Sequence, residues 1–193
     1  MRLLNSPRLN FYFACFTEAA LIGVAAIVGA VLRHGMFEEL RWRGLDAAWG
    51  TVTVGPMLIG FGWTLRSRKR FAADIRRFFE HVVRPVFGGW SVLQLAAISI
   101  LAGISEEALF RGALQAGLLR VIGTGPALLV ASVAFGLAHP VSKEYITSAT
   151  VIGLLLGGLF IATNNLLAPI VAHGVYDFCA LVWFLRFHRG DPR

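Results

Sequence analysis

Residues 87–104, FGGWSVLQLAAISILAGI, form an uncharged stretch that ends at a polar interruption formed by Ser105, Glu106 and Glu107. A helix of this length can just cross a hydrocarbon layer of about 30 Å. Residues 47–65 are equally free of charge, and residues 11–32 are apolar apart from one threonine and one glutamate. This pattern predicts membrane-spanning helices and excludes an ordinary water-soluble domain.

The composition agrees with this interpretation. Of the 193 residues, 56% are hydrophobic and 15% are charged, and the mean hydropathy is +0.68. Soluble domains carry about 25% charged residues. A chain of this length has room for one compact unit. We therefore expect residues 1–193 to form a single integral membrane domain, located in the cytoplasmic (inner) membrane if the source is bacterial.

Further apolar runs cover residues 126–138, 146–163 and 166–187, which brings the expected number of crossings to about six. Backbone groups inside a lipid bilayer must form hydrogen bonds within their own segment unless the chain makes a closed barrel. None of these segments alternates between polar and apolar residues as a barrel strand does. The expected fold is an all-α, polytopic membrane helical bundle.

Residues 66–86 differ from the rest of the chain, because seven of its eighteen Lys and Arg residues lie between Arg66 and Arg84. Apolar side chains recur here at helical spacing, with arginines on the opposite face; the apolar positions are Phe71, Ile75, Phe78, Phe79 and Val82. The segment therefore predicts one amphipathic helix at the membrane surface. A solvated basic loop is the alternative.

The net charge of +7 raises the question of nucleic acid. However, basic clusters between apolar runs are typical of the cytoplasmic loops of membrane proteins. The expected partners are membrane lipids with anionic headgroups, and no nucleic acid.

Several ionisable residues interrupt the apolar segments. An ionised group near the bilayer centre costs about 2.5 to 3.5 kcal/mol on insertion scales, so a set of them is expected to face one another or a water-filled cavity. The set comprises Glu18, Glu106, Glu107, Arg111, His139, His173 and Asp177.

Helical spacing separates the roles of the two adjacent glutamates. Glu107 and Arg111 are four residues apart and can form an ion pair on one helix face. Glu106 lies about 140° from Arg111 around the helix, since successive residues differ by about 100°. The spacing of Glu107 and Arg111 is therefore typical of a structural ion pair, whereas Glu106 is left available for a chemical role.

The positions of Glu106 and His139 are matched about a helix break. Each lies fourteen residues from one edge of the break at residues 120–125, or about 21 Å along its own helix. An antiparallel helical hairpin would bring the two side chains together. His173 and Asp177 are four residues apart on a later helix, and His173 fits this depth less well.

Three motifs occur in order: EExxxR at residues 106–111, FxxxH at 135–139 and HxxxD at 173–177. Together they resemble the CAAX protease and bacteriocin-processing family of intramembrane proteins, also called the Abi family. The resemblance covers residues 88–187, which would form the catalytic core. It implies a glutamate-dependent intramembrane endopeptidase that needs no metal and no cofactor and acts on a peptide or membrane-protein substrate.

On this resemblance Glu106, with His139, would activate a water molecule for attack on a peptide carbonyl. His173 and Asp177 would stabilise the oxyanion or orient the group that does. Where the CAAX-cleaving branch has asparagine, this chain has Asp177, which donates a hydrogen bond only when protonated. The supporting residues would be Glu107, Arg111 and Phe135.

Two other classes of function stay open. A zinc-dependent membrane protease could use Glu106, His139, His173 and Asp177 as ligands, although the chain has no H-E-x-x-H motif and its two cysteines lie inside apolar runs. A non-enzymatic scaffold or proton relay would also use intramembrane carboxylates. Glu18 matches no motif, and we expect it to bond within the bundle or near an interface.

Overall fold

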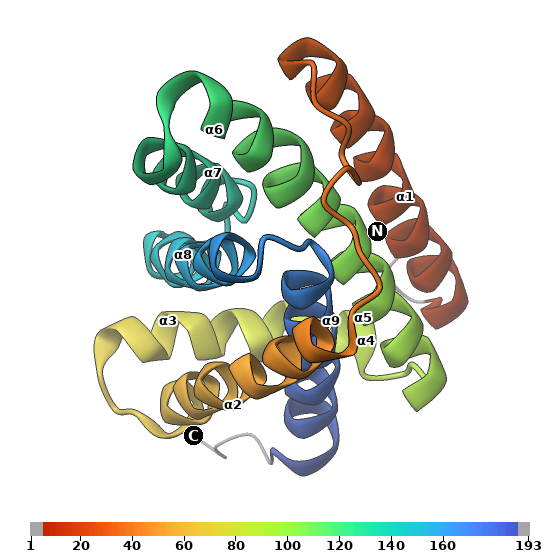
Figure 1. Ribbon diagram of the computed structural model, residues 1–193. Coiled ribbons are helices and arrows are strands. Elements are labelled where there is room, and N and C mark those ends of the chain that lie inside the picture. The colour runs from red at the N-terminus through yellow and green to blue at the C-terminus, as the bar shows by residue number, and fades with distance from the viewer. Residues whose placement is uncertain (1–5, 189–193) are drawn as a thin grey trace.

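The computed structural model describes residues 6–188, and seven continuous helices make up the regular structure of this part of the chain (Figure 1). The all-α prediction is confirmed. The helices are α1 (Pro7–Leu32); α2 (Gly44–Arg66); α3 (Arg70–Phe78), which continues through a π-helix (Phe79–Val83) into α4 (Arg84–Phe87); α5 (Val92–Glu107), which continues through a π-helix (Ala108–Gln115) into α6 (Ala116–Ile122); α7 (Thr124–Leu137); α8 (Lys143–Thr163); and α9 (Leu167–Val182), which ends in a π-helix (Trp183–Phe187).

Four of these helices are long and apolar enough to cross a membrane: Pro7–Leu32, Val92–Ile122, Lys143–Thr163 and Leu167–Phe187. The chain is thus a polytopic, integral membrane protein. The apolar helix α7, with 14 residues, is shorter. Helix α2 has 23 residues but is not among the four.

The helix from Val92 to Ile122 runs through the two adjacent glutamates without a break. The sequence suggested a polar interruption there. The helix continues because Glu107 is neutralised one turn later by Arg111, whose Nη1 lies 2.7 Å from its Oε1. The π-helix that begins at Ala108 follows directly, and such insertions are frequent at functional sites.

The basic segment is helical from Arg70 to Phe87. Its inward face includes Ile75 and Val83, while Val82 is exposed. The sequence pattern placed Val82 on the apolar face. The π-helix at Phe79–Val83 turns the chain by less per residue than an α-helix and so exchanges these two positions.

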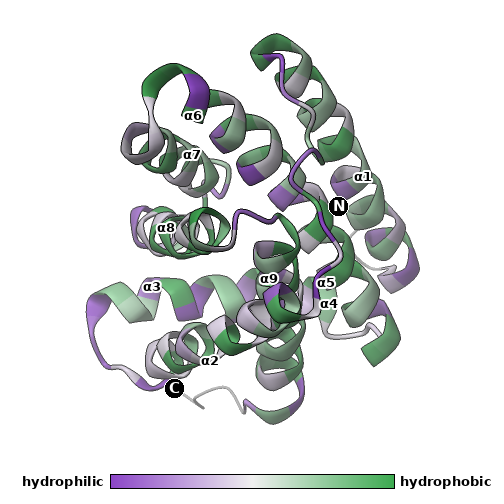
Figure 2. Cartoon of the chain, in the orientation of Figure 1, coloured by the Kyte–Doolittle hydropathy of each residue, from purple (hydrophilic) through white to green (hydrophobic). Residues whose placement is uncertain are grey.

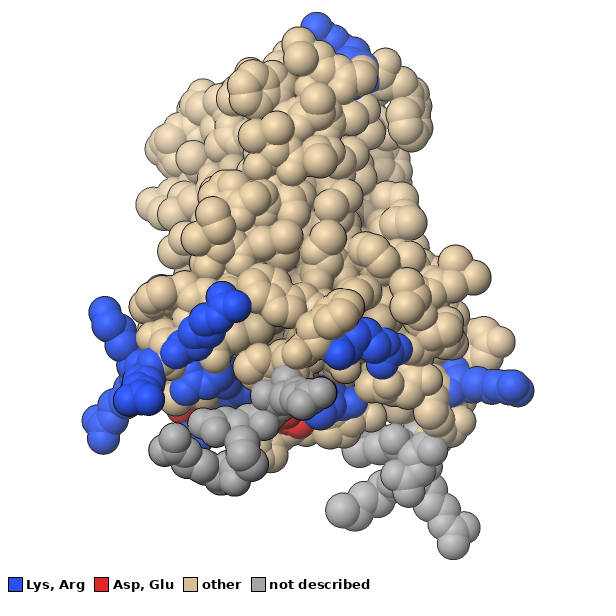
Figure 3. Space-filling view, turned by 90° about the horizontal axis from the view of Figure 1, so that it is seen from below, with Lys and Arg blue, Asp and Glu red and all other residues tan. Residues whose placement is uncertain are grey.

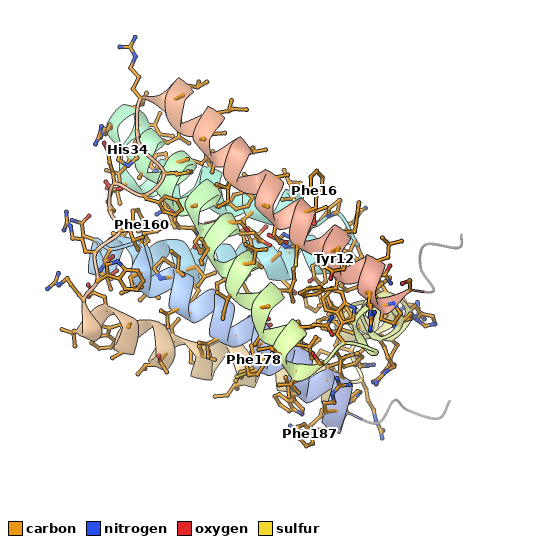
Figure 4. The ribbon with its side chains drawn as sticks, turned by 90° about the vertical axis from the view of Figure 1, so that its right-hand side faces the viewer. Tyr12, Phe16, His34, Phe160, Phe178 and Phe187 are labelled. Atoms are coloured by element: carbon orange, nitrogen blue, oxygen red, sulfur yellow. The ribbon has the colours of Figure 1, made fainter. Side chains whose placement is uncertain are left out.

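Charged groups are segregated to the ends of the bundle. In Figure 3 the Lys and Arg side chains gather along one side, and a broad band without them separates this side from a few at the opposite edge. Hydrophilic residues concentrate in the connecting loops and on α3 (Figure 2). Figure 4 shows Tyr12 and Phe187 near one end of the bundle and His34 and Phe160 near the other. This distribution is that of a membrane protein with a strongly basic end.

Helix α9 lies at the centre of the bundle and packs against both α5 and α2 (Figure 1). Gly103 on α5 permits this approach, because a Cβ there would lie 2.9 Å from the backbone nitrogen of Gly174 on α9. The absence of a side chain at residue 103 therefore sets the spacing between the two helices that carry most of the candidate site.

A buried asparagine ties the start of α9 to the loop that joins α1 and α2. Nδ2 of Asn165 donates to the carbonyl of Arg41 at 2.8 Å and to Oδ2 of Asp46 at 2.7 Å. Its Oδ1 accepts from the backbone nitrogens of Arg41 and Leu167, each at 3.0 Å. These bonds hold the first turn of α9, the helix that carries His173.

Candidate active site

One cavity of about 580 Å³ collects the residues that the sequence singled out for chemistry. Its lining includes Glu106 from the last turn of α5, His139 from the loop after α7, and His173 and Asp177 from α9. Residues that are up to 71 positions apart thus face a common space.

Glu106 and His139 face each other as the hairpin geometry predicted. Nε2 of His139 lies 3.7 Å from Oε2 of Glu106. The other ring nitrogen, Nδ1, lies 2.8 Å from the carbonyl oxygen of Phe135, so it must carry a proton and donate. The nitrogen that faces Glu106 is therefore the one able to accept a proton.

The carboxylate of Glu106 has a free oxygen. Its Oε2 is buried and has no hydrogen-bond partner among the described residues. Buried polar atoms are normally paired, and an exception in a native fold often marks a functional group. At 3.7 Å from His139 the distance is too long for a direct hydrogen bond. Glu106 is thus available to a ligand in the cavity.

Glu107 forms the predicted ion pair and also a contact that the sequence did not reveal. Its Oε1 accepts from Nη1 of Arg111 and lies 2.7 Å from Nδ1 of His173. Glu107 and Arg111 are almost completely buried. Arg111 also donates to the carbonyl of Gly153 at 3.0 Å, and its guanidinium lies 4.6 Å from the ring centre of Phe135. Glu107 therefore orients His173 as well as neutralising Arg111.

His173 is placed between two carboxylates. Besides the Glu107 contact, its Nε2 lies 3.4 Å from Oδ2 of Asp177, one helical turn later. Since Nδ1 donates to Glu107, Nε2 can donate as well only when the ring is protonated. Asp177 is therefore positioned to hold the orientation of this imidazole.

Phe135 separates the two histidines. Its ring centre lies 4.8 Å from that of His139 and 5.8 Å from that of His173. It is buried and also packs edge-on against Phe110. The aromatic ring thus fixes the spacing of the two imidazoles, and its backbone carbonyl fixes the proton on one of them.

Sequence reasoning did not assign Glu18 and Tyr145 to the site. Both line the cavity. Glu18 bonds within the bundle, as expected, because its Oε2 accepts from Oγ of Ser105 at 2.6 Å. The ring of Tyr145 lies 6.1 Å from that of His139. The signal for Glu18 was its charge within an apolar helix; Tyr145 gave none.

The geometry also bears on a metal. Within residues 6–188, the side chains gathered closely enough to hold an ion are His34, Glu38 and Glu39, with ligand atoms within 4.8 Å of one another. The four cavity residues do not form such a group. Both nitrogens of His34 already face carboxylate oxygens, at 2.6 Å and 2.9 Å.

The fold and these contacts define a polytopic helical membrane protein with a carboxylate–histidine site within its bundle. Residues 88–179 match the family model described as Type II CAAX prenyl endopeptidase Rce1-like. This part of the chain is a domain of that family, which confirms the resemblance seen in the three motifs. Neither the curated proteins nor the solved structures gave a match. Membership of a family of endopeptidases suggests a peptidase with protein substrates.

Proposed function

We propose that this protein is an intramembrane endopeptidase in which Glu106 and His139 activate a water molecule for attack on a peptide carbonyl. The observation that carries the proposal is that the two side chains face each other across 3.7 Å, with the buried Oε2 of Glu106 lacking a hydrogen-bond partner among the described residues. Both side chains line the same cavity, and both lie within the segment that matches the endopeptidase family.

The reaction follows from these positions. Glu106, assisted by Nε2 of His139, takes a proton from water as the oxygen bonds to the carbonyl carbon. The proton then passes to the amide nitrogen, the carbon–nitrogen bond breaks, and the products are a carboxylic acid and an amine. The hydrogen bond from Nδ1 of His139 to Phe135 keeps the accepting nitrogen directed at Glu106.

His173 and Asp177 are proposed to act on the oxyanion that forms during attack. A hydrogen-bond donor held in a water-excluded site stabilises such an anion strongly. Nε2 of His173, in the protonated form of the ring, is the candidate donor, because Nδ1 already donates to Glu107. The 3.4 Å contact supports a positioning role for Asp177 toward His173. Glu107, Arg111 and Phe135 support these groups without touching the substrate.

We further propose that α2 and α7 cross the membrane together with the four longer helices, which gives six crossings. Their packing against α9 and α8, respectively, supports this arrangement. The basic segment at residues 66–86 would lie at the membrane surface, in contact with anionic lipid headgroups. A core at residues 88–187 would then cleave a peptide or membrane protein delivered from the bilayer.

Cleavage of a quenched fluorogenic peptide library by the detergent-purified protein tests the activity. We expect hydrolysis by the wild type that persists with a strong chelator and is lost in Glu106→Gln and His139→Ala. Matched controls are Glu38→Gln and His81→Ala, whose side chains do not line the cavity. Loss of activity on chelation would favour the zinc protease, and activity retained in Glu106→Gln would contradict the proposed base.

A further inference from the structure

Glu18 is the only acidic residue of α1, a helix that is otherwise apolar enough to cross a membrane. It lies twelve positions into a helix of 26 residues and lines the same cavity as Glu106 and Asp177. A carboxylate at this depth is costly unless it faces partners or a polar space. Its position at the cavity wall therefore indicates that its carboxylate acts within that cavity.

The contact that holds Glu18 fixes its place relative to the proposed base. Oγ of Ser105 donates to Oε2 of Glu18 at 2.6 Å, and Ser105 is the residue directly before Glu106. Ser105 is completely buried. The carboxylate of Glu18, which comes from α1, is thus hydrogen-bonded to the helical turn of α5 that carries Glu106.

Among the described residues, the other acidic groups of the site each lie within 4.0 Å of a basic side chain, whereas Glu18 has none at that distance. Glu107 pairs with Arg111 and His173, Asp177 faces His173, and Glu106 faces His139. The ion pairs of residues 6–188 include none with Glu18, and its hydrogen-bond donor is a neutral hydroxyl. Acidic groups therefore outnumber basic ones in and around the cavity, and Glu18 is the one without a basic side chain close to it, so a positively charged ligand would balance excess negative charge there.

The remainder of the cavity lining is mostly apolar. The lining includes side chains of α2, α3 and the following π-helix, among them Trp63, Phe71, Phe78 and Phe79. The complementary ligand is an apolar segment with one positive charge. Since the charge would meet Glu18 beside Glu106, it would lie close to the bond that is cut.

We propose that Glu18 is a specificity-determining residue that selects substrates with a lysine or arginine close to the scissile bond. This inference rests on the proposed function and names the substrate class of that site: apolar peptide segments that carry a basic side chain. An acidic residue at the same place in the substrate would be repelled.

The test uses a peptide of the fluorogenic library that the wild type cleaves. At each position near the scissile bond, a version with lysine is compared with a version with norleucine. We expect the wild type to prefer the lysine peptide at one of these positions. The ratio of the two kcat/KM values should fall by roughly tenfold or more in Glu18→Gln and be largely kept in Glu18→Asp. Thr17→Val, at a lipid-exposed neighbour, should keep the wild-type ratio. An equal ratio in wild type and Glu18→Gln overturns the proposal.

A binding measurement separates this proposal from the proposed chemistry. Fluorescence anisotropy of the labelled lysine and norleucine peptides is followed with Glu106→Gln and with the double variant Glu18→Gln/Glu106→Gln. If the lysine peptide binds more tightly than the norleucine peptide to Glu106→Gln but not to the double variant, the role of Glu18 is supported. This holds even if no preparation cleaves either peptide. Equal affinities in both variants, or no binding of either peptide, contradict it.

Discussion

Nδ1 of His173 and Oε1 of Glu107 are 2.7 Å apart, although the residues are separated by 66 positions in the chain. The same glutamate oxygen accepts the hydrogen bond from Arg111. The contact joins α5 to α9 inside the bundle and fixes the ring of one of the two histidines of the site. A glutamate that the sequence identified as half of an ion pair therefore also positions His173.

Glu107→Gln should strongly destabilise the protein, because it leaves the guanidinium of Arg111 buried without its countercharge. Removing one partner of a buried pair costs about 3 to 5 kcal/mol. The measurement is the melting temperature in detergent, followed by tryptophan fluorescence. Glu39→Gln, a partly exposed carboxylate at the end of the bundle, is the control and should have a smaller effect. Equal melting temperatures for Glu107→Gln and the wild type would refute the assigned contact.

Gly103→Ala should separate α5 from α9 and so lower both stability and proteolytic activity. The added methyl group would meet backbone atoms of Ile170 and Gly174 at 3.0 Å or less, and backbone atoms cannot move aside as a flexible side chain can. Overpacking of this kind costs about 1 to 3 kcal/mol. Gly158→Ala is the matched control, since nothing lies within 4 Å of the added carbon. A Gly103→Ala variant as stable as Gly158→Ala would be inconsistent with this packing.

Asn165→Ala should loosen the loop between α1 and α2, because it removes the bonds to Arg41, Asp46 and Leu167. Faster amide hydrogen exchange in residues 33–43 is the expected readout. The neighbouring Asn164 has a positive φ of 46°, which glycine also adopts readily. Asn164→Gly should therefore leave the exchange of this loop unchanged, and similar exchange in both variants would argue against the Asn165 contacts.

The ion pair between Glu80 and Arg84 predicts a small dependence of stability on pH. The hydrogen bond from Arg84 lowers the pKa of Glu80 below its ordinary value. A carboxyl whose pKa is lowered on folding adds stability above its unfolded pKa of about 4.3, and this stability is lost as the pH falls through the lower folded value. Glu80→Gln should therefore cost about 0.5 to 1 kcal/mol at neutral pH and much less in acid. A difference in melting temperature that persists below this range would contradict the assignment.

The local features of the fold could be predicted from spacing alone. The ion pair of Glu107 and Arg111 depends only on the helical repeat, and the approach of Glu106 to His139 depends only on the position of one helix break. The contacts of Glu107 with His173 and of Glu18 with Ser105 join different helices. They depend on how each helix is rotated about its axis, which apolar residues distributed around a lipid-exposed helix do not specify.

Local sequence patterns also did not predict where a helix continues or changes to a π-helix. Ser105, Glu106 and Glu107 interrupt the apolar pattern after residue 104, but burial of Glu107 beside Arg111 keeps the helix intact. The exchange of Val82 and Val83 at the inward face results from a π-helix that hydropathy does not indicate. Such features depend on packing between helices.

The proposed role of Glu106 is tested most simply by the rate of peptide cleavage by wild type and Glu106→Gln, each purified in the same detergent and assayed with a strong chelator present. Melting curves of both proteins establish that each is folded. We expect hydrolysis by the wild type under chelation and none above background for a folded Glu106→Gln. Cleavage by Glu106→Gln at the wild-type rate, or abolition of wild-type cleavage by the chelator, would contradict the proposed role.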